Sequence, residues 1–150
     1  MNVAGGTVYG GNGEVYITGG NLLTGGIKMN ADATGIARIY LDGGILDVTI
    51  GWAATAAENY NDGRVEFRNN SKLVIGDGVL QWKGTGKLAA VNAHIQSGHI
   101  TYGTSLMTNN YPDVIPDQSW TSADGAVTIH ADNNQLRAGY TVVWAVSNDS

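Results

Sequence analysis

The chain has 150 residues, of which 43% are hydrophobic and 14% charged, and its net charge is -5. This composition fits a single domain that is long enough to bury a core. It argues against nucleic acid as a partner, because phosphate binding needs clustered Lys and Arg and only eight basic residues are present. The lack of cysteine excludes disulfides and thiolate metal sites, and no apolar run is long enough to span a membrane.

Residues 1–12 are expected to form a partial coil, and a repeated pattern follows them. Residues 13–20, 37–44 and 63–70 each combine alternating apolar residues with a final Gly-Gly or Asn-Asn pair. Alternation with period two predicts a strand that buries one face, and Gly or Asn tolerates the positive φ of a sharp corner. A repeat every 24 to 26 residues indicates stacked structural units.

Overlaying the three copies predicts which side chains should stack between neighbouring strands. The expected inward stacks are Val15–Ile39–Val65 and Ile17–Leu41–Phe67, and the outward stacks are Glu14–Arg38, Tyr16–Tyr40, Asp42–Arg68 and Arg38–Arg64. Opposite charges and paired aromatics stabilise neighbouring strands, so all the outward stacks except the arginine pair favour this register.

One helix is expected after the repeats. Leu88, Val91 and Ile95 lie at helical spacing, Thr85 is a candidate N-cap, and Gly98 stands where a helix often ends. A helix in this place would cover the end of the repeat core. Residues 99–102, 127–129 and 140–146 are expected to be strands, the last two as an antiparallel pair, with a long unpatterned loop at 104–124.

These elements predict an all-β fold, a short right-handed parallel β-helix or β-solenoid with a capping helix and a C-terminal strand pair. The single domain 1–150 would comprise coils over 1–83, the capping helix at 84–98, and strands with a long loop over 99–150. The coil at residues 1–12 is expected to leave its apolar side chains and strand edge open to another chain or to preceding coils.

The repeat also carries a resemblance to known proteins. Residues 39–46, 72–77, 91–98, 99–102 and 140–143 resemble segments in the β-solenoid repeat regions of secreted bacterial surface proteins. Those proteins include the autotransporter-associated β-strand repeat, PEP-CTERM and LamG-associated types. The likeness covers about residues 13–103 and 126–146. It implies a solenoid fold and an extracellular or cell-surface location, and it specifies no activity.

No motif predicts an enzyme. Residues 84–88 are similar to a phosphate-binding loop, but Leu88 replaces the Ser or Thr that would bind Mg²⁺. A polysaccharide lyase or hydrolase would need clustered acids on one outer face. The sequence places no second acid near Asp47 or Asp77.

Metal and cofactor sites are not predicted either. The oxygen-rich loops 59–63 and 113–117 lack the EF-hand spacing and are expected to be solvated turns. His94, His99 and His130 lack the spacing of zinc ligands.

Two functions remain open. The first is a non-catalytic structural protein whose subunits associate head to tail into a surface filament or layer, with itself as partner. The candidate contact residues are Val3, Val8, Tyr140, Val142 and Trp144. The second is a carbohydrate-binding or adhesive module of a larger secreted protein, with a polysaccharide as partner. Its candidate contacts are the aromatic residues Tyr16, Tyr40, Trp52, Tyr60 and Trp82.

Overall fold

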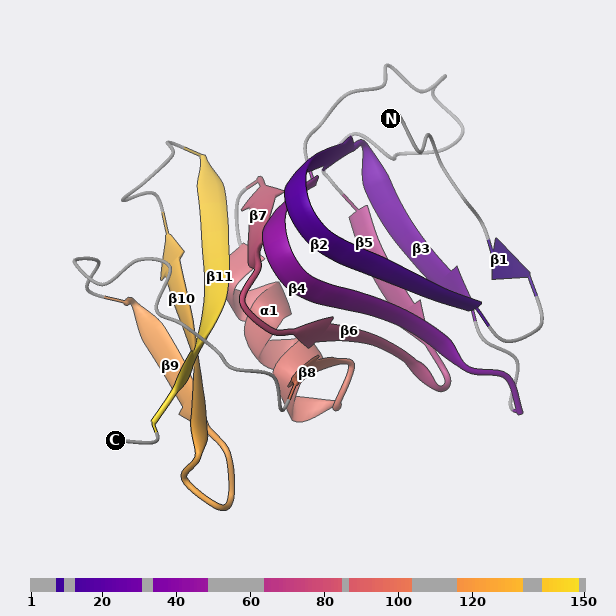
Figure 1. Ribbon diagram of the computed structural model, residues 1–150. Helices are drawn as coiled ribbons and strands as arrows, with labels where there is room; N and C mark the ends of the chain where they lie inside the picture. Colours follow the sequence, from indigo (N-terminus) through magenta and orange to yellow (C-terminus); the bar gives the residue numbers. More distant parts are fainter. Residues whose placement is uncertain are drawn as a thin grey trace.

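A computed structural model describes residues 8–9, 13–30, 34–48, 64–84, 87–103, 116–133 and 139–148. These residues form eleven strands and one helix (Figure 1). The strands are β1 (Val8–Tyr9), β2 (Gly13–Thr24), β3 (Gly26–Asn30), β4 (Ala37–Val48), β5 (Arg64–Arg68), β6 (Ser71–Ile75), β7 (Val79–Lys83), β8 (Ile100–Tyr102), β9 (Gln118–Thr121), β10 (Val127–Asn133) and β11 (Tyr140–Ser147). The helix α1 spans Lys87–Gln96 and is too short to cross a membrane, and the described residues contain no other helix.

The strands form two sheets. A small parallel sheet has the order β1-β3-β5, and a larger sheet of eight strands has the order β8-β6-β4-β7-β11-β10-β9, with β2 paired to β4 off that path. The larger sheet is mixed: β2, β6 and β7 are parallel to β4, and β8 is parallel to β6, whereas β11, β10 and β9 continue from β7 as an antiparallel ladder. It curls into a half-barrel, and α1 contacts β8, β10 and β11 (Figure 1).

The predicted parallel β-helix or β-solenoid is therefore wrong, and the right-handed winding assumed for it does not apply. The finding that overturns it is the path from β4 through β7 into β11, β10 and β9, which makes one mixed, curled sheet. The physical reason lies in the free edge of β7, with which residues 140–143 of β11 pair in antiparallel register. The expected antiparallel strands β10 and β11 do pair with each other, but inside this sheet.

The register predicted for the first two copies is correct, and the third copy is misplaced. Val15 pairs with Ile39 and Ile17 with Leu41. Ile17 and Leu41 are buried as expected, but the inward position predicted for Val15 is wrong, because this side chain is 48% exposed. Val65 and Phe67, however, pair with Ile27 and Met29 of β3 in the small sheet, not with β4. Their place beside β4 is taken by β6 and β7, where Leu73 pairs with Ile39, Ile75 with Leu41 and Val79 with Ile45. The expected stacks Asp42–Arg68 and Arg38–Arg64 are likewise wrong, because Arg68 pairs with Asn30 and Arg64 with Gly26.

The Gly-Gly pairs bend β2 and β4 within the larger sheet. Gly20 and Gly44 have φ angles of 75° and 71°, in the region that favours glycine. A Cβ atom at Gly44 would lie 2.4 Å from the carbonyl oxygen of Gly20, so the two bends stack backbone on backbone. The register between β2 and β4 shifts at this bend, between Ile17 and Asn21. The sharp curvature of the sheet therefore starts at these glycines.

The main core is apolar. The strands contribute the fully buried residues Leu41, Leu73 and Ile75, and α1 contributes Val91. In the helix, Lys87 and Val91 are the buried residues. A smaller cluster, Val79, Val142 and Trp144, is buried separately from this core. The helix ends at Gln96, and Gly98 follows its end as predicted, with a φ of 75° and a hydrogen bond donated to the carbonyl of Ile95. Thr85, the expected N-cap, lies outside the described residues.

Candidate functional site

A groove lies where the two edge strands of the half-barrel, β8 and β9, approach each other, and we call it the seam groove. Its volume is about 430 Å³. It is lined by Lys72, Ile95, Ile100, Thr101, Tyr102, Trp120, Thr121, Ser122, Ala123 and Ile129. These residues come from β6, α1, β8, β9, the turn after β9, and β10. The seam groove therefore exists because the curled sheet does not close on itself.

The floor of the seam groove is apolar and its walls carry aromatic rings. Ile100 and Ile129 are almost fully buried, whereas Tyr102 is 38% exposed. The Trp120 Nε1–H donates a hydrogen bond of 2.8 Å to the Asn92 Oδ1 of α1. This bond holds the indole in one orientation, so the ring is already ordered before any ligand arrives.

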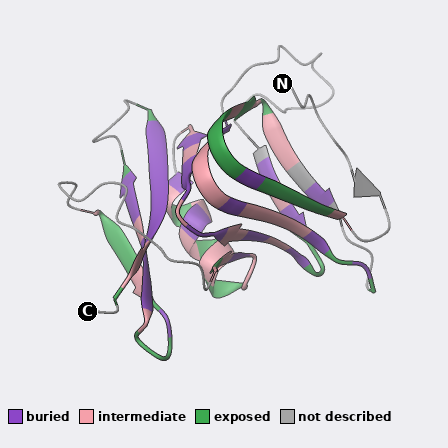
Figure 2. Ribbon diagram, in the orientation of Figure 1, coloured by how far each residue is buried: buried purple, intermediate pink, exposed green. Residues whose placement is uncertain are grey.

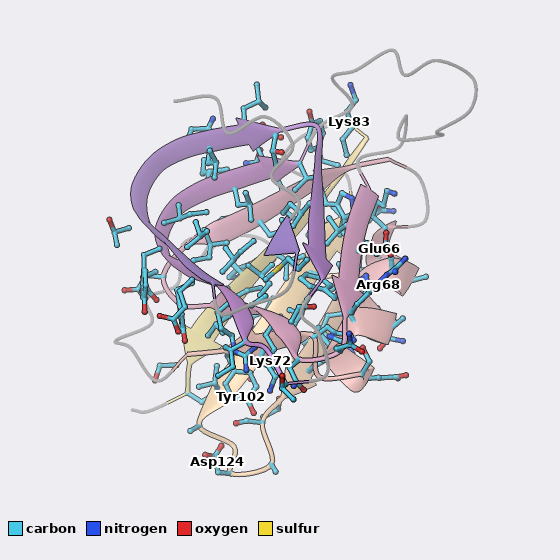
Figure 3. All side chains as sticks on the ribbon, turned by 90° about the vertical axis from the view of Figure 1, so that its right-hand side faces the viewer. Glu66, Arg68, Lys72, Lys83, Tyr102 and Asp124 are labelled. Atoms are coloured by element: carbon cyan, nitrogen blue, oxygen red, sulfur yellow. The ribbon has the colours of Figure 1, made fainter. Side chains whose placement is uncertain are left out.

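Lys72 supplies the only cationic side chain of the seam groove lining. It pairs in register with Arg38 of β4, whose guanidinium donates to the Asn70 and Ala37 carbonyls. Among the described residues no carboxylate forms an ion pair with Lys72. Figure 3 labels Lys72 and Tyr102, which lie in the same region of the molecule. The groove thus combines a cation with an exposed phenol ring.

The hydroxyl groups of the groove differ in their availability. The Thr121 hydroxyl contacts the Thr128 hydroxyl at 3.1 Å, and the Ser122 hydroxyl is engaged by Asp124 and by the backbone N–H of Val127. The Thr101 hydroxyl forms no hydrogen bond to another described residue. The same holds for the Tyr102 hydroxyl, so Thr101 and Tyr102 carry the hydroxyls that are open to a ligand among the described lining residues.

A second surface surrounds β2, which pairs with β4 alone among the described strands. The rings of Tyr16 and Tyr40 stack with centroids 4.7 Å apart and planes within 9°, as the predicted outward pairing requires. Both phenols donate to the Glu14 carboxylate, at 2.9 and 3.3 Å. The hydrogen bond to Glu14 raises the pKa of Tyr16 above its ordinary value. The phenol rings therefore present a fixed, exposed aromatic face.

The same strand leaves large apolar side chains in solvent. Val15 is 48% exposed, Tyr16 58% and Leu23 50%, and Figure 2 shows β2 coloured mostly as exposed. Exposed apolar groups on a strand whose second edge pairs with no described strand are typical of an interaction surface.

The other candidates from the sequence fall in different places. Tyr140, Val142 and Trp144 lie on β11 and are at most 4% exposed, so they face the inside of the protomer. Trp82 is also buried, with the Lys87 ammonium 4.9 Å from the centroid of its ring system. Val8 lies on β1, and its side chain, like Val3, Trp52 and Tyr60, is outside the described residues.

The sequence analysis missed Tyr102 and Trp120. Each lies on a strand of three or four residues, too short for alternation to be recognised, and residues 116–121 fell within the loop expected at 104–124. The available signal was an aromatic residue just before that loop, Tyr102, and another within it, Trp120.

A cluster of aromatic and imidazole rings joins α1 to the small sheet. Phe67 meets His94 edge-on at 4.9 Å and stacks on His99 at 5.7 Å. Burial, and then repulsion from His99, lower the pKa of His94. A lowered pKa means that the fold favours the neutral imidazole.

The folded protein should therefore lose stability as the pH falls below about 6.5, the ordinary pKa of histidine, because the unfolded chain then binds the proton more readily. We expect the melting temperature of the wild type to decrease as the pH is lowered from about 7 to about 5. In His94→Gln this decrease should be smaller. His130, whose pKa is also lowered by burial, accounts for part of the remainder.

Asp124→Asn is the matched control. The hydrogen bond from Ser122 lowers the pKa of Asp124, so this carboxylate is already ionised throughout the range in which histidines titrate. Identical pH profiles for the wild type and His94→Gln would contradict the assignment.

The described residues contain no group of three or more His, Asp or Glu side chains arranged to hold a metal ion. The predicted solvated turn at 59–63 and residues 113–115 lie outside them. No family model, no curated protein and no solved structure matches the chain. The comparisons thus identify no repeat family, and the site has to be interpreted from its own chemistry.

Proposed function

We propose that the protein is a non-catalytic structural protein whose subunits self-associate through the edge of β2 that pairs with no described strand, which we call its free edge. The observation that carries this proposal is a strand of 12 residues with one described neighbour and three large apolar side chains in solvent. The extracellular or cell-surface location implied by the resemblance belongs to the same proposal.

The physical argument starts from the backbone. A strand edge presents a row of N–H and C=O groups that can pair with another strand, and proteins that avoid this place Lys, Pro or a covering element at the edge. The sequence of β2 contains neither Lys nor Pro, and its one charge is Glu14. Burying part of Val15 and Leu23 at an interface would add roughly 25 cal/mol for each Å² of apolar surface removed from water.

The partner strand that fits is β2 of a second copy, in antiparallel register about a two-fold axis. Both strands then have the same length, and with pairing centred on the middle of the strand the two Glu14 carboxylates lie at opposite ends. Such an interface closes on itself as a dimer. The head-to-tail filament or layer expected from the sequence stays a prediction, because it needs a second surface complementary to β2.

The change that tests the interface is Val15→Lys. This side chain is half exposed, so lysine should leave the melting temperature of the protomer nearly unchanged while adding a charge to the open edge. In sedimentation equilibrium we expect the wild type to shift from one to two subunits as its concentration rises, and the variant to stay monomeric.

Ala89→Lys is the matched control, because Ala89 is exposed on α1, away from β2. It adds the same charge and should dimerise like the wild type. A wild-type chain that stays monomeric at millimolar concentration would contradict self-association. Growth beyond two subunits would favour the head-to-tail arrangement over the two-fold one.

A second candidate function, carbohydrate binding, is favoured by a separate observation, the seam groove, which carries the inference below.

A further inference from the structure

We propose that the seam groove binds an acidic sugar, a pyranose unit that carries a carboxylate, within a polysaccharide chain. This ligand satisfies the three kinds of group that the groove presents: aromatic rings, an open hydroxyl and a single cation. The site is distinct from β2 and does not depend on the self-association proposed above.

The shape of the seam groove suits a sugar chain. Its volume of about 430 Å³ is within the range of about 300–1,000 Å³ typical of small-molecule sites. The groove is only partly enclosed, so one sugar unit can lie in it while the rest of the chain extends into solvent.

Aromatic rings provide the first contact. The C–H faces of a pyranose stack on phenol or indole rings, and Tyr102 and Trp120 lie on the two strands that border the seam groove. The hydrogen bond from Trp120 to Asn92 fixes one of these rings, which lowers the entropy lost on binding.

Charge provides the second contact and selects the sugar. Lys72 is the one ionic side chain of the lining, and Arg38 lies next to it in register on β4. In the described part of the chain no acidic side chain neutralises Lys72 by an ion pair. A carboxylate on the ligand would receive a charge-assisted hydrogen bond from the Lys72 ammonium, whereas a neutral sugar would not. The open Thr101 hydroxyl can bond to a ring hydroxyl.

An extended peptide is the rival occupant, and it would pair with the edges of β8 and β9 that no described strand covers. These strands have only three and four residues, so they offer few backbone hydrogen bonds to a peptide. The aromatic and cationic side chains therefore favour the sugar, and the peptide becomes an outcome of the test.

The test is a titration of the full chain with trigalacturonate and, as a neutral partner of equal length, maltotriose. Binding is followed by calorimetry and by the NMR signal of the Trp120 indole N–H. We expect trigalacturonate to shift that signal and to bind about tenfold or more tightly than maltotriose, with an affinity that falls as salt is added. Lys72→Gln should remove this preference, and Tyr102→Ala should weaken both sugars.

Lys83→Gln is the matched control, since it removes the same charge from β7 at the other end of the molecule (Figure 3). It should bind trigalacturonate like the wild type. Equal affinity for both sugars, an unchanged affinity in Lys72→Gln, or no binding at millimolar sugar would overturn the proposal. Displacement of the Trp120 signal by a polyvaline-type strand peptide but not by trigalacturonate would also overturn it, in favour of strand addition.

Discussion

Gly44→Ala is expected to lower the free energy of unfolding by roughly 3 kcal/mol or more, whereas Gly20→Ala should cost only about 1–2 kcal/mol. Both glycines have a positive φ, so both variants carry the same backbone strain. They differ in their surroundings. A Cβ atom at Gly44 meets the Gly20 oxygen at 2.4 Å and the Gly19 carbonyl carbon at 2.6 Å, while a Cβ atom at Gly20 meets nothing within 4 Å.

The difference between the two variants, measured by urea unfolding, isolates the close approach of β2 to β4 at the bend. Backbone atoms cannot move aside without breaking the ladder between these strands, so the clash at Gly44 cannot be relieved cheaply. Equal losses of stability in the two variants would show that the bends of β2 and β4 are not stacked as described.

Leu41→Asp should destabilise the protein by several kcal/mol, roughly 4 or more, and it should prevent folding if the native stability is modest. Leu41 is fully buried, pairs with Ile17 and Ile75, and lies against Gly78, where an added Cβ would come 2.6 Å from its Cγ atom. An aspartate there would bury a carboxylate among apolar groups that offer it no partner.

Tyr40→Asp, one residue away, is the control. Tyr40 is on the opposite face of β4 from Leu41. Its replacement by aspartate removes the stacking on Tyr16 and places a carboxylate near Glu14, and it should lower the free energy of unfolding by about 1 kcal/mol. Chemical denaturation of both variants gives the comparison. Similar losses would mean that the two faces of β4 are assigned incorrectly.

Local patterns in the sequence predicted the elements that depend on neighbouring residues. The alternation in residues 13–17 and 37–41 gave the register of β2 on β4, including the stacked pair Tyr16–Tyr40. The helical spacing and Gly98 gave α1 and its end. In both cases the side-chain period and a residue with positive φ were sufficient.

The third repeat was misplaced because period-two alternation identifies a strand but not the strand beside it. Asn69 does adopt a positive φ, of 50°, as the corner interpretation expected. This corner, however, connects β5 of the small sheet to β6 of the larger one, whereas the Gly-Gly bends lie within β2 and β4. The equivalent of the first two copies begins at Ser71, whose hydroxyl closes the turn by donating to the Arg68 carbonyl.

The seam groove could not be predicted from the sequence either. It requires the pairing of β11 with β7, a contact between residues 140–143 and 80–83 that no local period encodes. Because of that contact the sheet is mixed and continues through β11 and β10 to β9. Trp120 of β9 and Tyr102 of β8 therefore line the same groove.

Hydrogen exchange at several protein concentrations tests the central proposal, pairing at the free edge of β2, most directly. Amides in Gly13–Thr24 should exchange more slowly as the concentration rises, because they become hydrogen-bonded to a second subunit, while amides of the central strand β11 should not change. Val15→Lys should abolish the concentration dependence. Exchange in Gly13–Thr24 that is independent of concentration in the wild type would contradict the account.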